Sequence, residues 1–148
     1  MKNSKINSKE VEVQYTFVNN DGFYKENAIV YPFDKETITS VVNTKITCAN
    51  YRLGQVRDGK FDVFYAGRVT GEPLRQRLQE HLVEYGDYTD AFFQFIVQDT
   101  EESAYQQECK DFHTYQDIDE EKDKGYFKNK YHPARPTNSS ITCKICGK

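Results

Sequence analysis

The sequence has no tryptophan, one methionine and four prolines among its 148 residues, and it contains no long apolar run. Because a membrane-spanning helix needs about 18 or more consecutive apolar residues, the missing run argues against an integral membrane protein. The first ten residues are polar and lack the apolar segment of a secretion signal. The sequence therefore predicts a soluble, cytoplasmic protein that does not associate with a membrane.

An excess of basic charge is also missing, since 20 lysines and arginines stand against 23 aspartates and glutamates, a net charge of −3. Nonspecific affinity for nucleic acid comes from basic side chains that neutralise phosphates, so this balance argues against a protein that coats nucleic acid. The charge is uneven, however. Residues 84–123 carry thirteen acidic and two basic residues, whereas residues 125–148 carry five basic residues and no acidic one. Residues 50–82 are weakly basic, and the two basic stretches could form one surface that faces phosphates.

Cysteine is scarce too, and four cysteines without a secretion signal are expected to stay reduced, which disfavours a disulfide scaffold. Cys143-x-x-Cys146 has the spacing of a zinc knuckle, although a redox dithiol or two incidental cysteines would give the same pattern. Cys48 is expected to pack inside a hairpin.

A second pair of metal-binding side chains occurs in the last predicted helix. Cys109 and His113 are four residues apart, so both side chains face the same way on a helix and can reach one ion. Together with Cys143 and Cys146 they predict a structural zinc site. His132 competes with His113 as the fourth ligand, and a buried Cys109 beside an unrelated histidine is the alternative without metal.

The hydrophobic pattern predicts β-hairpins, helices and an irregular C-terminal end. The predicted strands are Val11–Val18, Phe23–Tyr31, Thr47–Val56, Phe61–Val69 and Ala91–Val97. The predicted helices are a short one capped by Asp34, Pro73–Tyr85, and one from Asp99 or Thr100 to about Tyr115, followed by a charged loop at Asp117–Lys124.

These elements predict an α+β fold in which a small antiparallel β-sheet is flanked by helices and extended by an extra N-terminal β-hairpin. We divide the chain into an N-terminal extension at 1–46, a central domain at 47–131 and a C-terminal tail at 132–148 that packs on that domain. Three roles are open for the hairpin: it could read DNA, bridge a homodimer or cover the sheet edge.

Several short motifs occur along the central domain in a fixed order. Tyr65-Ala66-Gly67-Arg68 lies in a predicted strand, Leu74-Arg75-Gln76-Arg77-Leu78 begins the next helix, Ala104-x-x-x-Glu108 lies in the last helix, and Asn129 follows. In this order they resemble a GIY-YIG nuclease domain. Tyr65-Ala66-Gly67 matches the second signature tripeptide with alanine for isoleucine, and Ala49-Asn50-Tyr51 keeps only the tyrosine of the first.

The resemblance implies a catalytic set of Tyr51, Tyr65, Arg77, Glu108 and Asn129. A single carboxylate such as Glu108 suits Mg²⁺ or Mn²⁺, and the Arg77 guanidinium can hold a phosphate with two hydrogen bonds. A tyrosine would act as general base or position the attacking water, and Asn129 would hold the site together.

Basic side chains near these positions are expected to contact DNA, namely Arg68, Arg75, His81, Lys128 and Lys130. Each candidate also has an ordinary structural explanation, because strand tyrosines usually pack, helical Arg77 and Glu108 usually pair or face water, and an asparagine can cap a turn.

The sequence thus predicts a metal-dependent endonuclease that hydrolyses phosphodiester bonds in DNA. The alternative is a catalytically inactive, zinc-stabilised module on the same scaffold that binds DNA or a protein.

Overall fold

A long β-hairpin forms the centre of the computed structural model, which describes residues 11–14, 27–122, 125–137 and 139–148. Its strands are β3 (Cys48–Arg57) and β4 (Lys60–Thr70), joined by a tight turn at Asp58 and Gly59. Both turn residues have positive φ, 54° and 76°, as a two-residue hairpin turn requires. The sequence therefore predicted this hairpin correctly.

The hairpin contains a β-bulge that matters for the site. Leu53 pairs with Tyr65 and Gly54 pairs with Val63, so Phe64 has no partner across the ladder. As a result, Phe64 and Tyr65, although adjacent, both pack in the same apolar cluster, while Val63 belongs to the cluster on the opposite face. A Cβ atom at Gly54 would lie 2.5 Å from the carbonyl oxygen of Asp62, which accounts for the glycine at this position.

The described strands form one sheet in the order β1-β2-β5-β3-β4. It includes β1 (Val11–Gln14), β2 (Asn27–Pro32) and β5 (Ala91–Val97). Neighbouring strands are antiparallel, and a single parallel pair, Gln14 with Lys60, brings β1 against β4. The predicted N-terminal hairpin is thus part of the sheet, where β2 covers the edge of β5. Its predicted turn lies outside the described residues.

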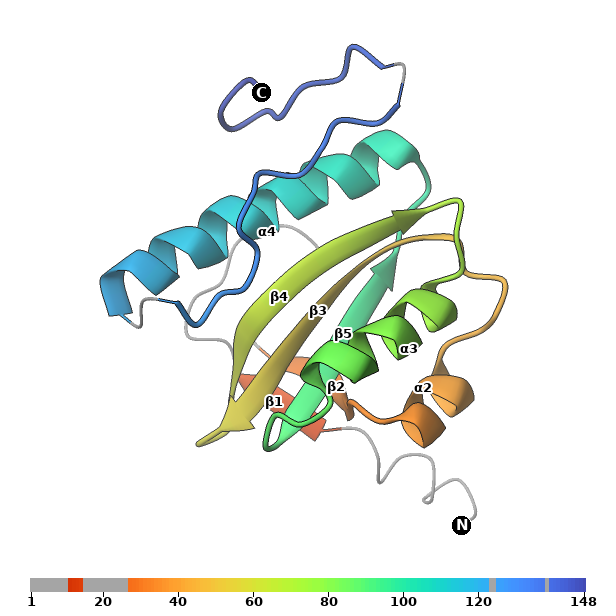
Figure 1. Cartoon of the computed structure of the whole chain (residues 1–148), viewed down its shortest axis with the longest axis vertical. Helices are drawn as coiled ribbons and strands as arrows, with labels where there is room; N and C mark the ends of the chain where they lie inside the picture. Colours follow the sequence, from red (N-terminus) through yellow and green to blue (C-terminus); the bar gives the residue numbers. More distant parts are fainter. Residues whose placement is uncertain (1–10, 15–26, 123–124, 138) are drawn as a thin grey trace.

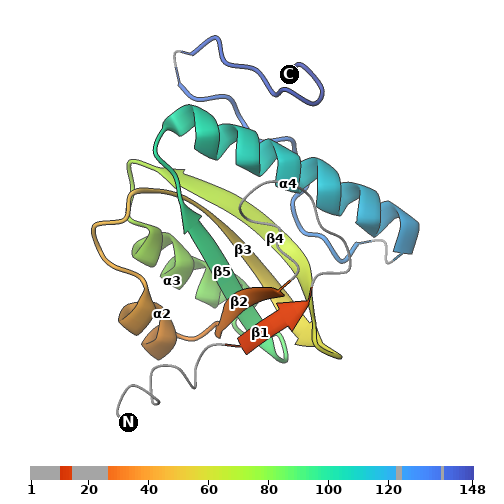
Figure 2. The ribbon, with the colours of Figure 1, turned by 180° about the vertical axis from the view of Figure 1, so that it is seen from behind.

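Helices cover both faces of this sheet (Figures 1 and 2). The helices α2 (Lys35–Val41) and α3 (Leu74–Tyr85) lie on one face, and α4 (Glu101–Lys122) crosses the other. The larger apolar cluster lies under α2 and α3 and includes Ile38, Leu78 and Phe93, and a second one packs under Phe112 of α4. The molecule is therefore α+β, with an antiparallel sheet flanked by helices, as the sequence predicted.

Local signals explain most helix ends. The Asp34 carboxylate accepts a hydrogen bond from the Thr37 backbone N–H at 2.8 Å and caps α2, and Thr100 caps α4 through the Ser103 N–H at 3.0 Å. The predicted loop at Asp117–Lys124 was wrong, because α4 continues to Lys122. That stretch contains two glutamates and two lysines, which are good helix formers, and no proline or glycine. The first glycine after it is Gly125, with a φ of 89°.

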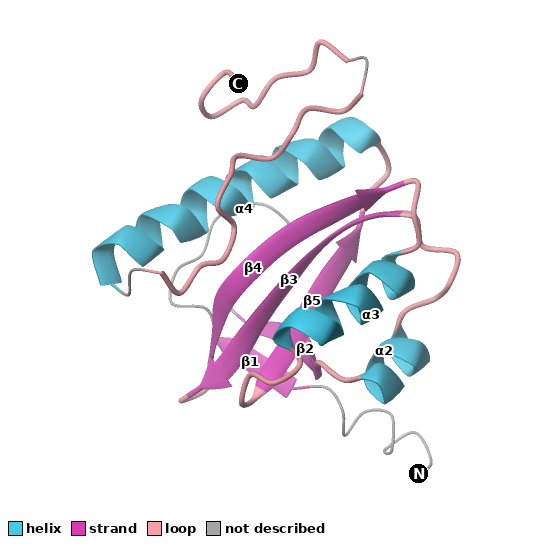
Figure 3. Ribbon diagram, in the orientation of Figure 1, coloured by secondary structure: helices cyan, strands magenta, loops and turns pink. Residues whose placement is uncertain are grey.

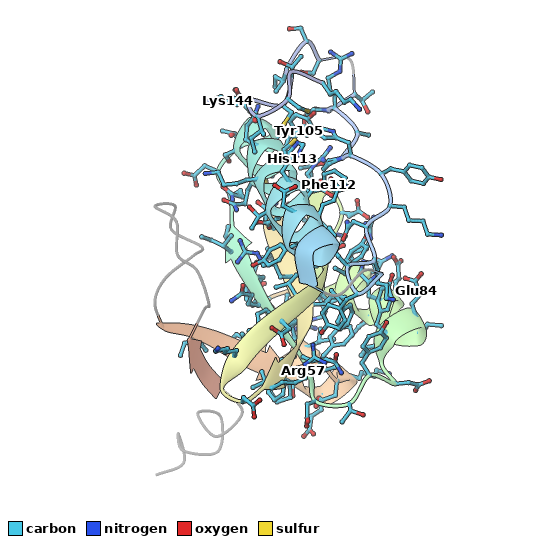
Figure 4. The ribbon with its side chains drawn as sticks, turned by 90° about the vertical axis from the view of Figure 1, so that its left-hand side faces the viewer. Arg57, Glu84, Tyr105, Phe112, His113 and Lys144 are labelled. Atoms are coloured by element: carbon cyan, nitrogen blue, oxygen red, sulfur yellow. The ribbon has the colours of Figure 1, made fainter. Side chains whose placement is uncertain are left out.

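After α4 the chain has no regular secondary structure in its described part and runs back over α4 and β4 (Figure 3). The tail contacts α4 through Gln106, which donates to the Thr142 carbonyl at 2.7 Å and accepts from the Lys144 N–H at 3.0 Å. The Tyr105 hydroxyl also donates to the carbonyl of Lys148. Tyr105 and His113 lie on α4 beneath this tail, at the same end of the molecule as Lys144 (Figure 4).

No helix in the described ranges is both long enough and apolar enough to cross a membrane.

Candidate functional site

Tyr51 of β3 and Gly67 of β4 face each other across the hairpin. Tyr51 is fully buried, and a Cβ atom at position 67 would collide with its phenol ring and hydroxyl. The glycine of the second tripeptide is therefore what lets the Tyr51 phenol occupy this place. Its hydroxyl is 2.8 Å from Nε2 of His81, on α3.

Tyr65 completes an aromatic group with these two side chains. Its ring centroid is 6.2 Å from that of Tyr51 and 4.7 Å from that of His81. Burial is the main cause that raises the pKa of both tyrosines, that of Tyr51 well above its usual value, and nearby Arg77 only partly opposes it. Both phenols are therefore protonated at neutral pH.

His81 is placed to accept a proton from Tyr51. Burial lowers its pKa, although the charge and hydrogen bond of Glu84 partly oppose the shift, so the ring is mainly neutral near pH 7. Its Nδ1 is 3.1 Å from the Glu84 carboxylate. A proton on Nδ1, shared with Glu84, would leave Nε2 free to accept the hydrogen bond of Tyr51.

Arg77 lies one helical turn before His81 on α3 and reaches the same group. Its positive charge lowers the pKa of the Tyr51 phenol, and it forms ion pairs with Glu72 and, at 3.4 Å, with Glu80. Its side chain is 30% exposed. The guanidinium therefore acts electrostatically on the phenol while part of it stays accessible to a ligand.

Glu108 approaches from α4, and its charge raises the pKa of both Tyr51 and Tyr65. Burial raises the pKa of Glu108 itself, and Arg68 opposes that rise. Nη1 of Arg68 is 2.5 Å from the Glu108 carboxylate, and the two side chains are 15% and 14% exposed, respectively. The carboxylate that α4 brings to this group is thus paired with a basic side chain of β4.

Asn129 connects the tail to the tripeptide strand. Its side-chain oxygen accepts from the Ala66 N–H at 2.9 Å, and its side-chain nitrogen donates to the Ala66 carbonyl at 2.7 Å. Because this amide satisfies both backbone groups of Ala66, it fixes the strand between Tyr65 and Gly67. The five predicted catalytic side chains therefore belong to one interconnected region.

The other predicted DNA-binding residues are placed differently. Arg75 donates to the carbonyls of Val42 and Thr39 at the end of α2, so its guanidinium satisfies helix carbonyls rather than joining the tyrosine group. Lys128 donates to the Gly125 carbonyl, and Lys130 is exposed.

A second group of side chains could hold a metal ion. One ligand atom each from His113, His132, Cys143 and Cys146 lies within 4.8 Å of all the others. Cys143 Sγ is 3.7 Å from His113 Nε2, and Cys146 Sγ is 3.4 Å from His132 Nε2. Burial raises the pKa of Cys143, but hydrogen bonds from the Cys146 and Ile145 backbone and from His132 outweigh it and bring the pKa to about 6.

This grouping corrects the predicted ligand set. His113 and His132 were treated as competitors, yet the structure brings both together, and Cys109 is not among the four gathered residues. Cys109 is buried against Tyr105 and Cys143, and burial raises its pKa to about 12, which disfavours the thiolate that a metal binds. It packs as a small apolar side chain.

The sequence analysis also missed a buried ion pair behind the site. Arg52 of β3 and Asp111 of α4 are fully buried and lie 2.7 Å apart, and Arg52 also donates to Gln94 of β5 at 2.9 Å. The signal in the sequence is Arg52 itself, a charged residue inside a strand of otherwise mostly uncharged residues, which requires a partner when it is buried.

A scan against protein-family models, a search of curated proteins and a search of solved structures each found no match. The described geometry is therefore the basis for assigning a function.

Proposed function

We propose that this chain is a metal-dependent endonuclease of the GIY-YIG type that hydrolyses phosphodiester bonds in DNA. The observation that supports it most is the gathering of Tyr51, Tyr65, Arg77 and His81 on one face of the β3–β4 hairpin, with Glu108 within electrostatic reach. These side chains come from four elements: three consecutive ones, β3, β4 and α3, and the later helix α4. Phosphodiester hydrolysis needs the kinds of group found there: a proton acceptor, a phosphate clamp and a carboxylate.

The catalytic cation fits the donor set. Mg²⁺ keeps most of its waters and needs only one or two protein carboxylates, with substrate phosphate as a further ligand, so Glu108 alone can hold it. When bound, the ion would offset charge on the phosphate and the leaving oxygen. Asp111 is not available for this role, because it is fully buried against Arg52.

The protein's own groups then divide the remaining work. Once substrate binding admits a water to the buried Tyr51 hydroxyl, the protonated phenol positions this water for attack. As the phenol takes a proton from the water, it passes its own proton to Nε2 of His81. The Arg77 guanidinium holds the phosphate and stabilises the charge that develops on it. Arg68 would leave Glu108 when the cation binds.

Cleavage of supercoiled plasmid tests this function. With Mg²⁺ we expect nicking or cutting by the wild type, and a loss of at least about a hundredfold in Glu108→Ala and Arg77→Ala, because each removes a group that acts on the transition state. Glu102→Ala, an exposed carboxylate on the same helix, is the matched control and should cleave normally. Undiminished cleavage by a folded Glu108→Ala protein would refute the assignment.

We further propose that the Cys/His cluster holds a structural zinc ion. Two thiolates and two imidazoles suit tetrahedral Zn²⁺, and one ion would join α4 to the tail through His113.

Plasma emission on purified protein measures the bound zinc. We expect one zinc per chain in the wild type and in Cys48→Ser, which lies outside the cluster, and less than half of that in Cys143→Ser. An unchanged zinc content in Cys143→Ser would show that the cluster does not hold it.

The second candidate is a DNA-binding or protein-binding module without turnover. The pairing of Arg68 with Glu108 favours it, since a paired carboxylate is less available to a cation. DNA binding without Mg²⁺-dependent cleavage of any substrate would favour this candidate over the enzyme.

A further inference from the structure

Residues 128–135, which we call the β4-edge segment, run beside β4 and are held there at several points. The Lys128 N–H donates to the Phe64 carbonyl at 2.6 Å, and Asn129 holds both backbone groups of Ala66. Nη2 of Arg68 donates to the Ala134 carbonyl at 2.8 Å. Successive anchors thus lie at Phe64, Ala66 and Arg68, alternate residues of one strand.

Between these anchors the segment turns two side chains to solvent. Tyr131 is 84% exposed, and Lys130 beside it is also exposed. The residues that bracket them are fixed: Asn129 bonds to Ala66, and His132 belongs to the Cys/His cluster. The backbone that carries Tyr131 is therefore already ordered, so a ligand that meets the ring pays little conformational entropy.

The surroundings of the ring suit a nucleic acid better than an apolar partner. Residues 125–148 carry five basic residues and no acidic one, and Arg135, four residues after Tyr131, is exposed as well. An aromatic face next to basic side chains is the combination that binds single strands, with stacking on the base and ion pairing with the phosphate. The bases of an intact duplex are already stacked on each other, so only an unpaired base can use such a ring.

The segment is also joined to the candidate catalytic groups. Asn129, two residues before Tyr131, fixes the strand between Tyr65 and Gly67, and Arg68, which pairs with Glu108, bonds to Ala134. A base on Tyr131 would therefore belong to a nucleotide near the hydrolysed bond.

We propose that Tyr131 and Lys130 form a binding site for an unpaired nucleotide, with the base stacked on Tyr131 and its phosphate at Lys130. The inference rests on the proposed nuclease function and narrows its substrate class to DNA that has a single-stranded part beside a duplex, such as a fork, flap or gap.

Fluorescence anisotropy with the full chain, without added Mg²⁺, tests this site on three labelled DNAs: a single strand, a fork and a blunt duplex of matched sequence. We expect tighter binding to the fork than to the blunt duplex. Tyr131→Ala should weaken fork binding at least about fivefold, the lower end of what one stacked base contributes, and change duplex binding less than twofold. Tyr131→Phe, which keeps the ring, should bind like the wild type. Val83→Ala, which trims a side chain on α3 that is 89% exposed, is the control for loss of exposed apolar surface.

A 2-aminopurine placed at each unpaired position of the fork reports stacking directly. Its fluorescence should be quenched at one position by the wild type and by Tyr131→Phe, but not by Tyr131→Ala. Unchanged fork binding in Tyr131→Ala, or an equal loss on fork and duplex, would overturn this inference while leaving the nuclease proposal intact. If the wild type bound none of the DNAs, both proposals would fail.

Discussion

At the residue scale, the contact between Tyr51 and His81 makes the proposed reaction sensitive to pH. Only a neutral His81 can accept the phenolic proton, and burial lowers its pKa below the ordinary value. The cleavage rate should therefore be constant near neutral pH and fall as the pH drops through this lowered pKa, below about 6.5.

A pH profile of the plasmid cleavage rate at saturating Mg²⁺ measures this effect. Glu84 raises the pKa of His81, so in Glu84→Gln the acid limb should move to lower pH. Glu80→Gln, on the same helix but without a hydrogen bond to His81, should move it less. An acid limb that is identical in all three proteins would assign it to another group.

The sequence could predict some of these residues and not others. Tyr51 and Tyr65 lie on a hairpin whose turn is evident, so their proximity follows from strand pairing alone. His132 could be predicted only as an alternative ligand, because its position depends on the path of a tail that has no periodic pattern. The role of Arg75 was also beyond the sequence, since the carbonyls it meets belong to Thr39 of α2 and to Val42, which directly follows that helix, more than thirty residues earlier.

At the scale of elements, the buried pair of Arg52 and Asp111 fixes α4 against β3 and β5. An ion pair of this kind contributes little net stability, but the loss of one partner leaves a buried charge without its counterion. We expect Asp111→Asn to lower the free energy of unfolding by about 3 to 5 kcal/mol.

Urea denaturation measures this loss, and the double variant Arg52→Met/Asp111→Leu should regain most of it because no buried charge is left. Asp62→Asn is the matched control, since its pair with Arg57 is solvent-exposed, with side-chain exposures of 40% and 49%, and it should change stability by less than about 1 kcal/mol. An Asp111→Asn protein as stable as the wild type would contradict the expected role of the pair.

Element prediction succeeded where periodicity and capping agreed and failed where one of them was missing. The helix predicted at Pro73–Tyr85 and the strand at Ala91–Val97 match α3 and β5 because apolar spacing marks both. The predicted end of α4 near Tyr115 is too early, because a run of charged residues does not by itself end a helix, and glutamate and lysine are good helix formers. The bulge at Phe64 was missed because the run of aromatic and aliphatic residues there looks regular.

At the scale of the whole molecule, the separation of charge predicts how DNA binding should respond to salt. The acidic excess lies in residues 84–123, while the β4-edge segment and the rest of the tail are purely basic. If the basic tail binds duplex DNA, each tenfold rise in salt concentration should lower the binding constant by about 0.9 log units for every phosphate that is contacted.

Anisotropy titrations from low to moderate NaCl measure this slope. Arg135→Ala should reduce its magnitude by about 1, as expected when one phosphate contact is lost. Lys45→Ala, an exposed lysine in the connection between α2 and β3, should leave the slope unchanged. Equal slopes in wild type and Arg135→Ala would show that Arg135 does not contact phosphate.

The bulge in β4 also decides where this chain tolerates changes in length. The extra residue at Phe64 shifts the alternation of side chains between the two faces of β4 by one position. One further residue inserted between Tyr65 and Arg68 would shift it again and turn either Tyr65 or Gly67 away from Tyr51. The turn at Asp58 and Gly59 lies beyond the last pairs of the ladder and can lengthen without any such reversal. An insertion in the turn at the tip of the hairpin should therefore preserve the candidate site, whereas an insertion a few residues further along β4 should disrupt it.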